Sequence, residues 1–227
     1  MMQRQLVITE DGSHTIHIPE LNTTYHSLHG AIQESMHVFI SAGLKFRLEK
    51  PITSNSLNIF EFGFGTGLNA MLSLIEAERA KQIINYTAIE LFPLNVAEAE
   101  SLNYCTELQR TDLQIPFNKM HNGEWEQLEM ITQSFYLHKT KQTIAAFNSA
   151  SKFDIVYFDA FDPETQPELW TNDVFDKLYS MINNGGILVT YSSKGDVRRA
   201  MQAAGFTVKK IPGPIGKREI TRAIKVG

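Results

Sequence analysis

Apolar residues along this chain change repeatedly between two spacings. Four short apolar runs have the length and composition of buried strands: residues 57–62, 85–90, 153–159 and 186–192. After the first run, apolar side chains recur at helical spacing, at positions 68, 71, 72 and 75. Strands that alternate with helices in this way are typical of an α/β fold with a mostly parallel sheet.

The first fifty residues lack this alternation. Asp11–Gly12 lies between two short apolar segments and favours a β-hairpin, and residues 30–44 have the pattern of a helix. Pro51–Ser56 has the composition of a linker. We therefore predict a small N-terminal extension at residues 1–50 and an α/β domain at residues 51–227.

The second half of the chain departs from a simple alternation in two places. Residues 206–211 and 219–225 have the pattern of strands on either side of a Pro- and Gly-rich turn, which predicts an antiparallel pair added to the sheet. The order of elements between residues 113 and 148 is open. There, Met120–Gly123 has the composition of a turn and Phe135–Leu137 that of a further strand.

Three glycines separate the first predicted strand from the helix after it. Gly63, Gly65 and Gly67 follow a G-x-G-x-G pattern, whereas a dinucleotide-binding loop has G-x-G-x-x-G. No lysine follows them, which excludes a Walker-type phosphate loop. Glycine tolerates positive φ and lets a ligand approach the backbone, so we predict a nucleotide-like ligand here. A glycine-rich turn without a ligand is the alternative.

With the acid before it, this loop resembles the cofactor loop of Rossmann-like S-adenosylmethionine methyltransferases. The cofactor contacts expected in the loop are Glu61, Gly63, Phe64, Gly65, Thr66, Gly67 and Asn69. The second strand ends in Glu90, and a carboxylate there can accept hydrogen bonds from both ribose hydroxyls. A surface glutamate at a strand end is the alternative for Glu90.

Asp159 follows the third clear strand, at the same edge of the predicted sheet as the glycine loop. Methyl transfer to an amine requires that the ammonium first lose a proton, which a carboxylate can accept. We therefore predict that Asp159 is the catalytic base and also contacts the cofactor; an aspartate that caps the next turn is the alternative. Asp162, beside Pro163, is expected to shape the loop. Phe161 is expected either to pack on a planar substrate base or to fill the core.

Composition excludes several classes of protein. The chain has 227 residues and one cysteine, so an internal disulfide and the paired cysteines of a zinc site are both absent. No apolar run is long enough to span a membrane, and the N-terminal residues lack a secretory pattern. We expect a cytoplasmic protein without a membrane segment or a metal. His26 and His29 form an isolated H-x-x-H that is not expected to bind one.

The formal net charge of −4 does not favour nucleic-acid binding, but the charges are unevenly distributed. From residue 190 onward the chain has nine Lys or Arg and two acids. A basic end on an acidic body can form a phosphate-binding face. The same charges can also point in several directions into solvent.

Several motifs together resemble a bacterial tRNA methyltransferase family that completes the 5-methylaminomethyl group on wobble (2-thio)uridine. The family occurs as the amino-terminal half of the bifunctional enzyme MnmC and as the standalone MnmD. The matching segments cover most of the chain: residues 24–35, 61–69, 89–94, 158–163, 167–171, 185–186, 190–192 and 216–219. The most specific are the aspartate loop with its Pro-x-x-Trp and the Gly-Lys-Arg-Glu segment.

The resemblance implies a Rossmann-like class I methyltransferase that uses S-adenosyl-L-methionine and acts on a tRNA anticodon stem-loop. It implies that Asp159 serves the aminomethyl nitrogen and that Lys217 and Arg218 meet tRNA phosphates. Phe161 and Tyr191 are expected on the substrate side as well. An aminomethyl-forming tRNA modification enzyme would act upstream.

One departure from the family concerns adenine. Many members carry Gly-Asp after the third strand, where the acid can meet the adenine amino group. Residues 137–141 of this chain contain no acid. Backbone groups, or the region from Met120 to Glu124, are expected to replace it.

Two other functions stay open. The first is a methyltransferase for a small amine or other metabolite, which the net acidity and the lack of a separate RNA-binding domain favour. The second is a non-catalytic cofactor-fold protein that binds RNA or a partner. The second predicts a damaged glycine loop or a missing Asp159, and neither is seen.

Overall fold

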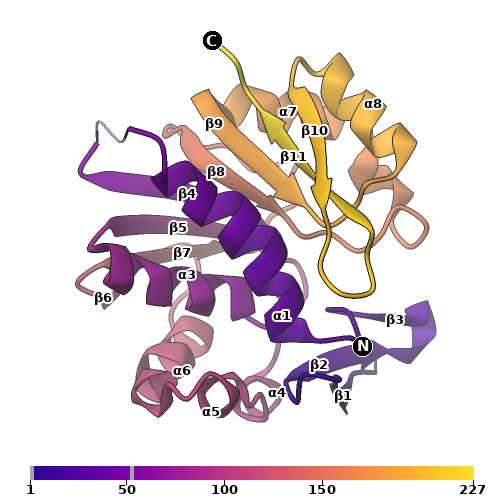
Figure 1. Cartoon of the computed structure of the whole chain (residues 1–227). Coiled ribbons are helices and arrows are strands. Elements are labelled where there is room, and N and C mark those ends of the chain that lie inside the picture. The colour runs from indigo at the N-terminus through magenta and orange to yellow at the C-terminus, as the bar shows by residue number, and fades with distance from the viewer. Residues whose placement is uncertain (1–2, 52–53) are drawn as a thin grey trace.

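A sheet of eight strands runs through the molecule in Figure 1, a computed structural model that describes residues 3–51 and 54–227. The strand order across the sheet is β10-β11-β9-β8-β4-β5-β7-β6. In chain order these strands are β4 (Ser56–Phe62), β5 (Ile83–Ile89), β6 (Leu128–Thr132), β7 (Phe135–Thr140), β8 (Phe153–Phe158), β9 (Ile182–Thr190), β10 (Thr207–Pro212) and β11 (Glu219–Ile224).

The five inner strands β7, β5, β4, β8 and β9 are parallel, and β6, β11 and β10 run antiparallel to their neighbours. The predicted α/β fold with an antiparallel final pair is confirmed. After β4 the chain fills one half of the sheet through β5, β6 and β7, and then returns to fill the other half from β8. In such sheets the ligand crevice lies where the order reverses, at the carboxyl ends of β4 and β8.

Helices cover both faces of the sheet (Figure 1). One face carries α3 (Leu68–Ala80) and α6 (Gln114–Asn122). Between β5 and α6 the chain forms α4 (Val96–Glu100), α5 (Tyr104–Glu107) and a short turn, η3 (Thr111–Leu113). The other face carries α7 (Asn172–Met181) and α8 (Gly195–Ala203). Side chains of β8 from Ile155 to Phe158 alternate between the two cores, which is why this part of the strand is apolar. None of these described helices has the length and apolar character of a membrane span.

A long helix from the N-terminal extension packs beside α3. It consists of α1 (Ala31–Ser35), a π-helical stretch η2 (Met36–Lys45) and α2 (Phe46–Leu48). The predicted helix over 30–44 is therefore confirmed and extends further. Gly43 allows its close approach to the sheet, since a Cβ there would lie 3.1 Å from the Val189 side chain and 3.2 Å from that of Tyr157.

The rest of the extension is a three-stranded antiparallel sheet: β1 (Gln5–Ile8), β2 (His14–Ile18) and β3 (Thr23–Thr24), with a short turn η1 (Pro19–Leu21) before β3. The predicted hairpin at Asp11–Gly12 is confirmed, and Ile8 pairs with His14 across it. The third strand was not predicted, because two residues are too few to show a pattern. In Figure 1 this sheet lies below the turn between β10 and β11, next to the carboxyl ends of the large sheet.

The order of elements that the sequence left open is now clear. Phe135–Leu137 is a strand, as predicted, and belongs to β7. The turn predicted at Met120–Gly123 is wrong, because Met120 to Asn122 form the end of α6. Strand β9 begins at Ile182, earlier than predicted. Part of the linker predicted at Pro51–Ser56 lies outside the described residues.

Candidate active site

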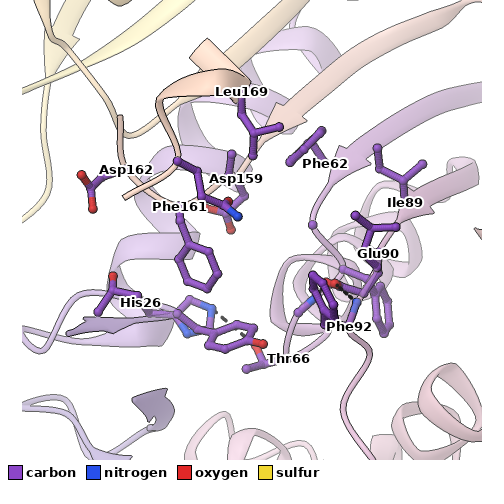
Figure 2. Close-up of a pocket in the computed structure, with 18 of the residues that line it drawn as sticks. His26, Phe62, Thr66, Ile89, Glu90, Phe92, Asp159, Phe161, Asp162 and Leu169 are labelled. Atoms are coloured by element: carbon purple, nitrogen blue, oxygen red, sulfur yellow. Dashed lines mark hydrogen bonds between the residues drawn. The ribbon is translucent and has the colours of Figure 1, made fainter. Parts of the chain in front are cut away.

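A cavity of about 650 Å³ lies at the carboxyl ends of the inner strands. Its wall combines the glycine loop, the segments after β5, β7 and β8, and residues 23–27 of the extension. Ten predicted site residues line it: Gly63, Phe64, Gly65, Thr66, Asn69, Glu90, Asp159, Phe161, Tyr191 and Lys217. Figure 2 shows Asp159 and Phe161 on one side of the cavity and Glu90 and Phe92 on the other.

The glycine loop has a backbone that other residues avoid. Gly63, Gly65 and Gly67 have φ angles of +86°, +51° and +72°. A Cβ on Gly63 would lie 3.2 Å from the carbonyl oxygen of Asp159, so glycine lets the ends of β4 and β8 approach each other. Gly67 does not line the cavity, but it immediately precedes the first turn of α3.

Residues from α6 and from the N-terminal extension hold the glycine loop in place. The Phe64 ring packs against His121 of α6, whose Nε2 donates to the Thr66 carbonyl oxygen at 3.0 Å. Burial lowers the pKa of His121 to about 4, so its ring is neutral at pH 7. The Thr66 hydroxyl lies 3.4 Å from Nε2 of His26, which comes from the extension. The loop is therefore held between two distant parts of the chain.

Glu90 is held in place by backbone N–H groups. Its two carboxylate oxygens accept hydrogen bonds from Gly65 N at 3.0 Å and Phe92 N at 2.8 Å. A carboxylate oxygen can accept more than one hydrogen bond, so Glu90 keeps acceptor capacity toward the cavity that it lines. The arrangement is compatible with the ribose-binding role predicted for it.

Asp159 and Asn69 meet at the opposite side of the glycine loop. Asn69 Nδ2, on the first turn of α3, donates to Asp159 Oδ2 and to Glu61 Oε1, at 2.9 Å in each case. Glu61 was predicted to contact the cofactor, but it is 1% exposed and does not line the cavity. It lies on the face of β4 that packs against α3, where its carboxyl group accepts the hydrogen bond from Asn69.

The charge of Asp159 is disfavoured by its surroundings. Burial and the nearby Glu34 carboxylate raise the pKa of Asp159 to about 7, and the Asn69 hydrogen bond and Lys217 only partly offset this. The group therefore changes its protonation state near neutral pH. A carboxyl group with this property is suited to accept and release a proton.

The same shift predicts a pH-dependent effect of Asp159→Asn on stability. The unfolded chain releases the Asp159 proton near the ordinary aspartate pKa of 3.8, whereas the folded chain releases it near 7. Ionisation therefore costs the wild type stability as pH rises through this window. We expect Asp159→Asn to melt at a higher temperature than the wild type at pH 8, with a much smaller difference at pH 4. Scanning calorimetry at both pH values measures this, and an equal difference at both would contradict the assignment.

Three hydrogen bonds shape the loop that carries Asp159. Trp170, in η4 (Pro167–Trp170), donates from Nε1 to the Phe161 carbonyl oxygen at 2.8 Å, and Tyr191 donates to the Ala160 carbonyl oxygen at 2.8 Å. Asp162 accepts from the Thr165 hydroxyl at 2.7 Å, in agreement with its predicted structural role. The Phe161 ring stays at the cavity, where its edge meets the ring of Tyr25 with centroids 5.4 Å apart.

The two basic residues predicted to meet phosphates differ in position. Lys217 forms an ion pair with the buried Glu34 carboxylate, and its ammonium lies 4.0 Å from the centre of the Tyr191 ring. It is therefore part of the cavity wall, with its charge compensated. Arg218 is exposed and does not line the cavity.

The prediction missed the contribution of the N-terminal extension. Tyr25 lines the cavity and lies against the glycine loop, where a Cβ on Gly65 would be 3.1 Å from its ring. Arg4 also lines it and donates to the Pro93 carbonyl oxygen at 3.1 Å and to Glu98 at 3.0 Å. The one signal in the sequence was the family-like segment at residues 24–35, to which no chemistry was assigned.

The region proposed for adenine also changes. Residues 121–125 line a separate hollow of about 270 Å³, and residues 142–145 after β7 line the main cavity instead. None of the residues Met120–Glu124 lines the main cavity, and how adenine is recognised stays a prediction. His26 lies between Thr15 and Thr66, while His29 pairs with Glu10. Across the described ranges, no group of three or more His, Cys, Asp or Glu side chains is placed to hold a metal.

Comparison with known proteins identifies the family. Residues 106–226, more than half of the chain, match a family described as S-adenosyl-L-methionine-dependent methyltransferase. The chain belongs to this methyltransferase family. Its cofactor is S-adenosyl-L-methionine, and the cavity suits this ligand because the backbone of Gly63 and Gly65 lines it and Glu90 supplies hydrogen-bond acceptors.

Individual relatives of this methyltransferase carry a more specific name. The chain is 28% identical over 214 residues to the tRNA 5-methylaminomethyl-2-thiouridine biosynthesis bifunctional protein MnmC of Pseudomonas savastanoi. This match covers 89% of the chain and 32% of that protein. It is 30% identical to the MnmC of Burkholderia mallei, covering 94% of the chain and 34% of that protein. The chain thus spans about a third of the length of these curated relatives.

Solved structures agree with the fold. The crystal structure of MNMC2 from Aquifex aeolicus is 25% identical and superposes over 100% of this chain and 72% of that one, with a TM-score of 0.74. Spermidine synthase from Thermotoga maritima is 11% identical, covers 99% and 72% of the two chains, and has a TM-score of 0.54. The second likeness concerns the fold alone.

Proposed function

We propose that this methyltransferase transfers a methyl group from S-adenosyl-L-methionine to the aminomethyl nitrogen of 5-aminomethyl-(2-thio)uridine at the tRNA wobble position. The product is 5-methylaminomethyl-(2-thio)uridine. The observation that carries the proposal is Asp159, a cavity-lining acid oriented by Asn69 beside the glycine loop. The names of the MnmC relatives and of the Aquifex structure support the choice of substrate.

In this proposal, Asp159 removes a proton from the acceptor ammonium. An ammonium has no lone pair, so nitrogen must be deprotonated before it can attack. A carboxyl group with a pKa of about 7 is mostly ionised at slightly alkaline pH, so it is available as a base. It is also a stronger base than an ordinary carboxylate. Asn69 fixes the carboxylate in place, which limits the reorganisation needed during the reaction.

The cofactor is proposed to lie on the glycine loop. Bound S-adenosyl-L-methionine supplies an electrophilic methyl group. Gly63, Phe64, Gly65 and Thr66 would hold it by close backbone approach, and Glu90 by accepting hydrogen bonds from the ribose. Gly67 and Glu61 would support this arrangement from outside the cavity.

The substrate side is proposed to be the aromatic part of the wall. Phe161, Tyr191 and Tyr25 surround the approach to Asp159 and offer flat surfaces to a uracil ring. The exposed Arg218 is proposed to meet a phosphate of the anticodon stem-loop. The proposal places the enzyme in the cytoplasm and requires an upstream tRNA modification enzyme that forms the aminomethyl group.

The alternative acceptor, a small amine, has one observation in its favour. The cavity wall carries the acids Glu34, Glu90, Asp159, Asp162 and Glu168, and its basic side chains Arg4 and Lys217 both form ion pairs with glutamates. Such a wall suits any cationic amine, whether free or attached to RNA. A non-catalytic role gains no support, because the glycine loop and Asp159 are both present.

Nucleoside mass spectrometry of tRNA from cells in which the gene is deleted tests the proposed substrate. We expect the unmethylated aminomethyl nucleoside to accumulate and the methylaminomethyl nucleoside to disappear. Returning the wild-type gene should bring both nucleosides back to their original levels. Unchanged tRNA nucleosides in the deletion strain would refute the proposed acceptor.

Arg218→Glu separates the two acceptors. We expect about a tenfold increase in KM for the anticodon stem-loop and a reduced salt dependence, because a phosphate contact becomes a repulsion. A small-amine acceptor should be methylated at the wild-type rate. Lys217 is unsuitable for this test, since its reversal would place a negative charge beside buried Glu34. Lys81→Glu, at the far end of α3, is the matched control. Equal effects of Arg218→Glu on both acceptors would contradict phosphate binding there.

A further inference from the structure

Two carboxyl groups share one amide donor beside the cavity. Asn69 Nδ2 donates to both Glu61 and Asp159, so the two acids stand within two hydrogen-bond lengths of each other. Glu61 lies near the end of β4, and Asp159 directly follows the neighbouring strand β8. Two negative charges this close, away from water, repel each other strongly. The pair therefore favours a state that holds one proton.

The surroundings of Glu61 favour its neutral form. It is 1% exposed, and its second oxygen, Oε2, makes no hydrogen bond within the described part of the chain. Burial raises the pKa of Glu61 well above its usual range. The titratable groups that act on it are Asp159, Glu90 and Tyr86 of β5, and none of these is a cation. An ionised Glu61 would thus be a buried charge that only neutral hydrogen-bond donors stabilise.

The surroundings of Asp159 are more favourable to a charge. Asp159 lines the cavity, which Glu61 does not. Of the charged groups that act on it, the Glu34 carboxylate opposes its ionised form and the Lys217 ammonium favours it. The amide of Asn69 donates equally to both acids, so the difference between them comes from the position of Asp159 at the cavity and from Lys217, a cation that does not act on Glu61.

We propose that Glu61 is a protonated, neutral carboxyl group in the folded protein at pH 7 to 8, and that through Asn69 it positions Asp159 as the anion of the pair. This inference rests on the proposed function, in which Asp159 accepts a proton. Glu61 touches neither cofactor nor acceptor and is therefore a positioning residue. Its neutral carboxyl holds the amide in place and adds no charge that would oppose ionisation of Asp159.

Infrared difference spectroscopy of the ligand-free full chain at pH 8 tests the protonation state. A protonated carboxyl absorbs in a region separate from carboxylates. We expect such a band in the wild type, its loss in Glu61→Gln and its persistence in Asp159→Asn. Glu76→Gln is the matched control, because Glu76 is also buried but forms an ion pair with Lys45 at 3.1 Å. That variant should keep the band.

Two outcomes would overturn the inference. One is a wild-type spectrum without a protonated carboxyl band at pH 8. The other is a band that survives in Glu61→Gln and disappears in Asp159→Asn, because the proton would then lie on Asp159. The wild-type and Asp159→Asn spectra decide the matter even if Glu61→Gln fails to fold. Since neither cofactor nor acceptor is present, failure here is distinct from failure of the proposed function.

The pH profile of methyl transfer tests the positioning role. Asn69→Leu removes the donor that favours the Asp159 anion, so we expect the acid limb of kcat/KM to move up by about one pH unit. Glu61→Gln is the neutral counterpart of the proposed state and should leave that limb within a few tenths of a unit. A downward shift of about one unit in Glu61→Gln would mean that Glu61 carries a charge, and would overturn the proposal.

Discussion

Replacing Asp159 with asparagine is expected to reduce kcat for methyl transfer by about 10²–10⁴-fold, the range typical of a lost general base. Asparagine has nearly the same shape and can remain beside Asn69, but it cannot take a proton from the acceptor. For the wild type, kcat/KM should rise with pH through a midpoint near 7, because only the ionised carboxylate accepts a proton. The remaining activity of the variant should lack this rise. Steady-state kinetics from pH 5 to 9 measure both effects.

Cofactor binding distinguishes the two roles predicted for Asp159. If it is mainly a base, calorimetric titration should give Asp159→Asn nearly the wild-type affinity for S-adenosyl-L-methionine. Asp162→Asn is the matched control, because Asp162 lies three residues away and bonds to Thr165 and Glu164 of its own loop. We expect it to lose far less activity. A variant of Asp159 that turns over within threefold of the wild type would contradict the mechanism.

The second large effect is expected from Gly63→Ala. A residue with a side chain at a φ of +86° carries about 1–2 kcal/mol of strain, and its Cβ would press against the Asp159 carbonyl oxygen. The loop can relieve this strain by leaving the conformation that the ligand needs. We expect cofactor affinity to fall about 5- to 30-fold, since each 1.4 kcal/mol changes it tenfold. Isothermal titration calorimetry with S-adenosyl-L-methionine measures the change.

Gly185→Ala controls for strain alone. Gly185 has a φ of +78°, a Cβ on it would meet no atom within 4 Å, and it stands in the first half of β9, away from the carboxyl ends. This variant should lose thermal stability but bind the cofactor as the wild type does. If both variants bound it equally well, the glycine loop would not be the cofactor site.

Much of the fold was predictable because each inner strand carries its own signal. Residues 57–62 and 153–159 place large apolar side chains on both faces, as is typical of buried parallel strands. Once those strands are placed side by side, Asp159 and the glycine loop must meet at one edge of the sheet. The Asn69–Asp159 hydrogen bond joins residues that are 90 positions apart and follows from this topology.

Other parts of the site depend on contacts that no local pattern carries. Lys217 and Glu34 are 183 positions apart, and their ion pair forms only because the N-terminal extension meets the turn between β10 and β11. Tyr25 likewise reaches the glycine loop only because the extension packs beside that loop in the folded chain. The position of Glu61 depends on the pleat of β4. The motif suggested a cofactor contact, whereas the pleat places this side chain on the face toward α3, buried beside Asn69.

Transfer of an isotopically marked methyl group tests the central claim most directly. The purified chain would be incubated with S-adenosyl-L-methionine that carries a trideuteromethyl group and with an anticodon stem-loop that contains 5-aminomethyluridine. After digestion, mass spectrometry should find the label on the aminomethyl nitrogen with the wild type and almost none with Asp159→Asn. An RNA that stays unlabelled while a free amine in the same mixture is methylated would contradict the account.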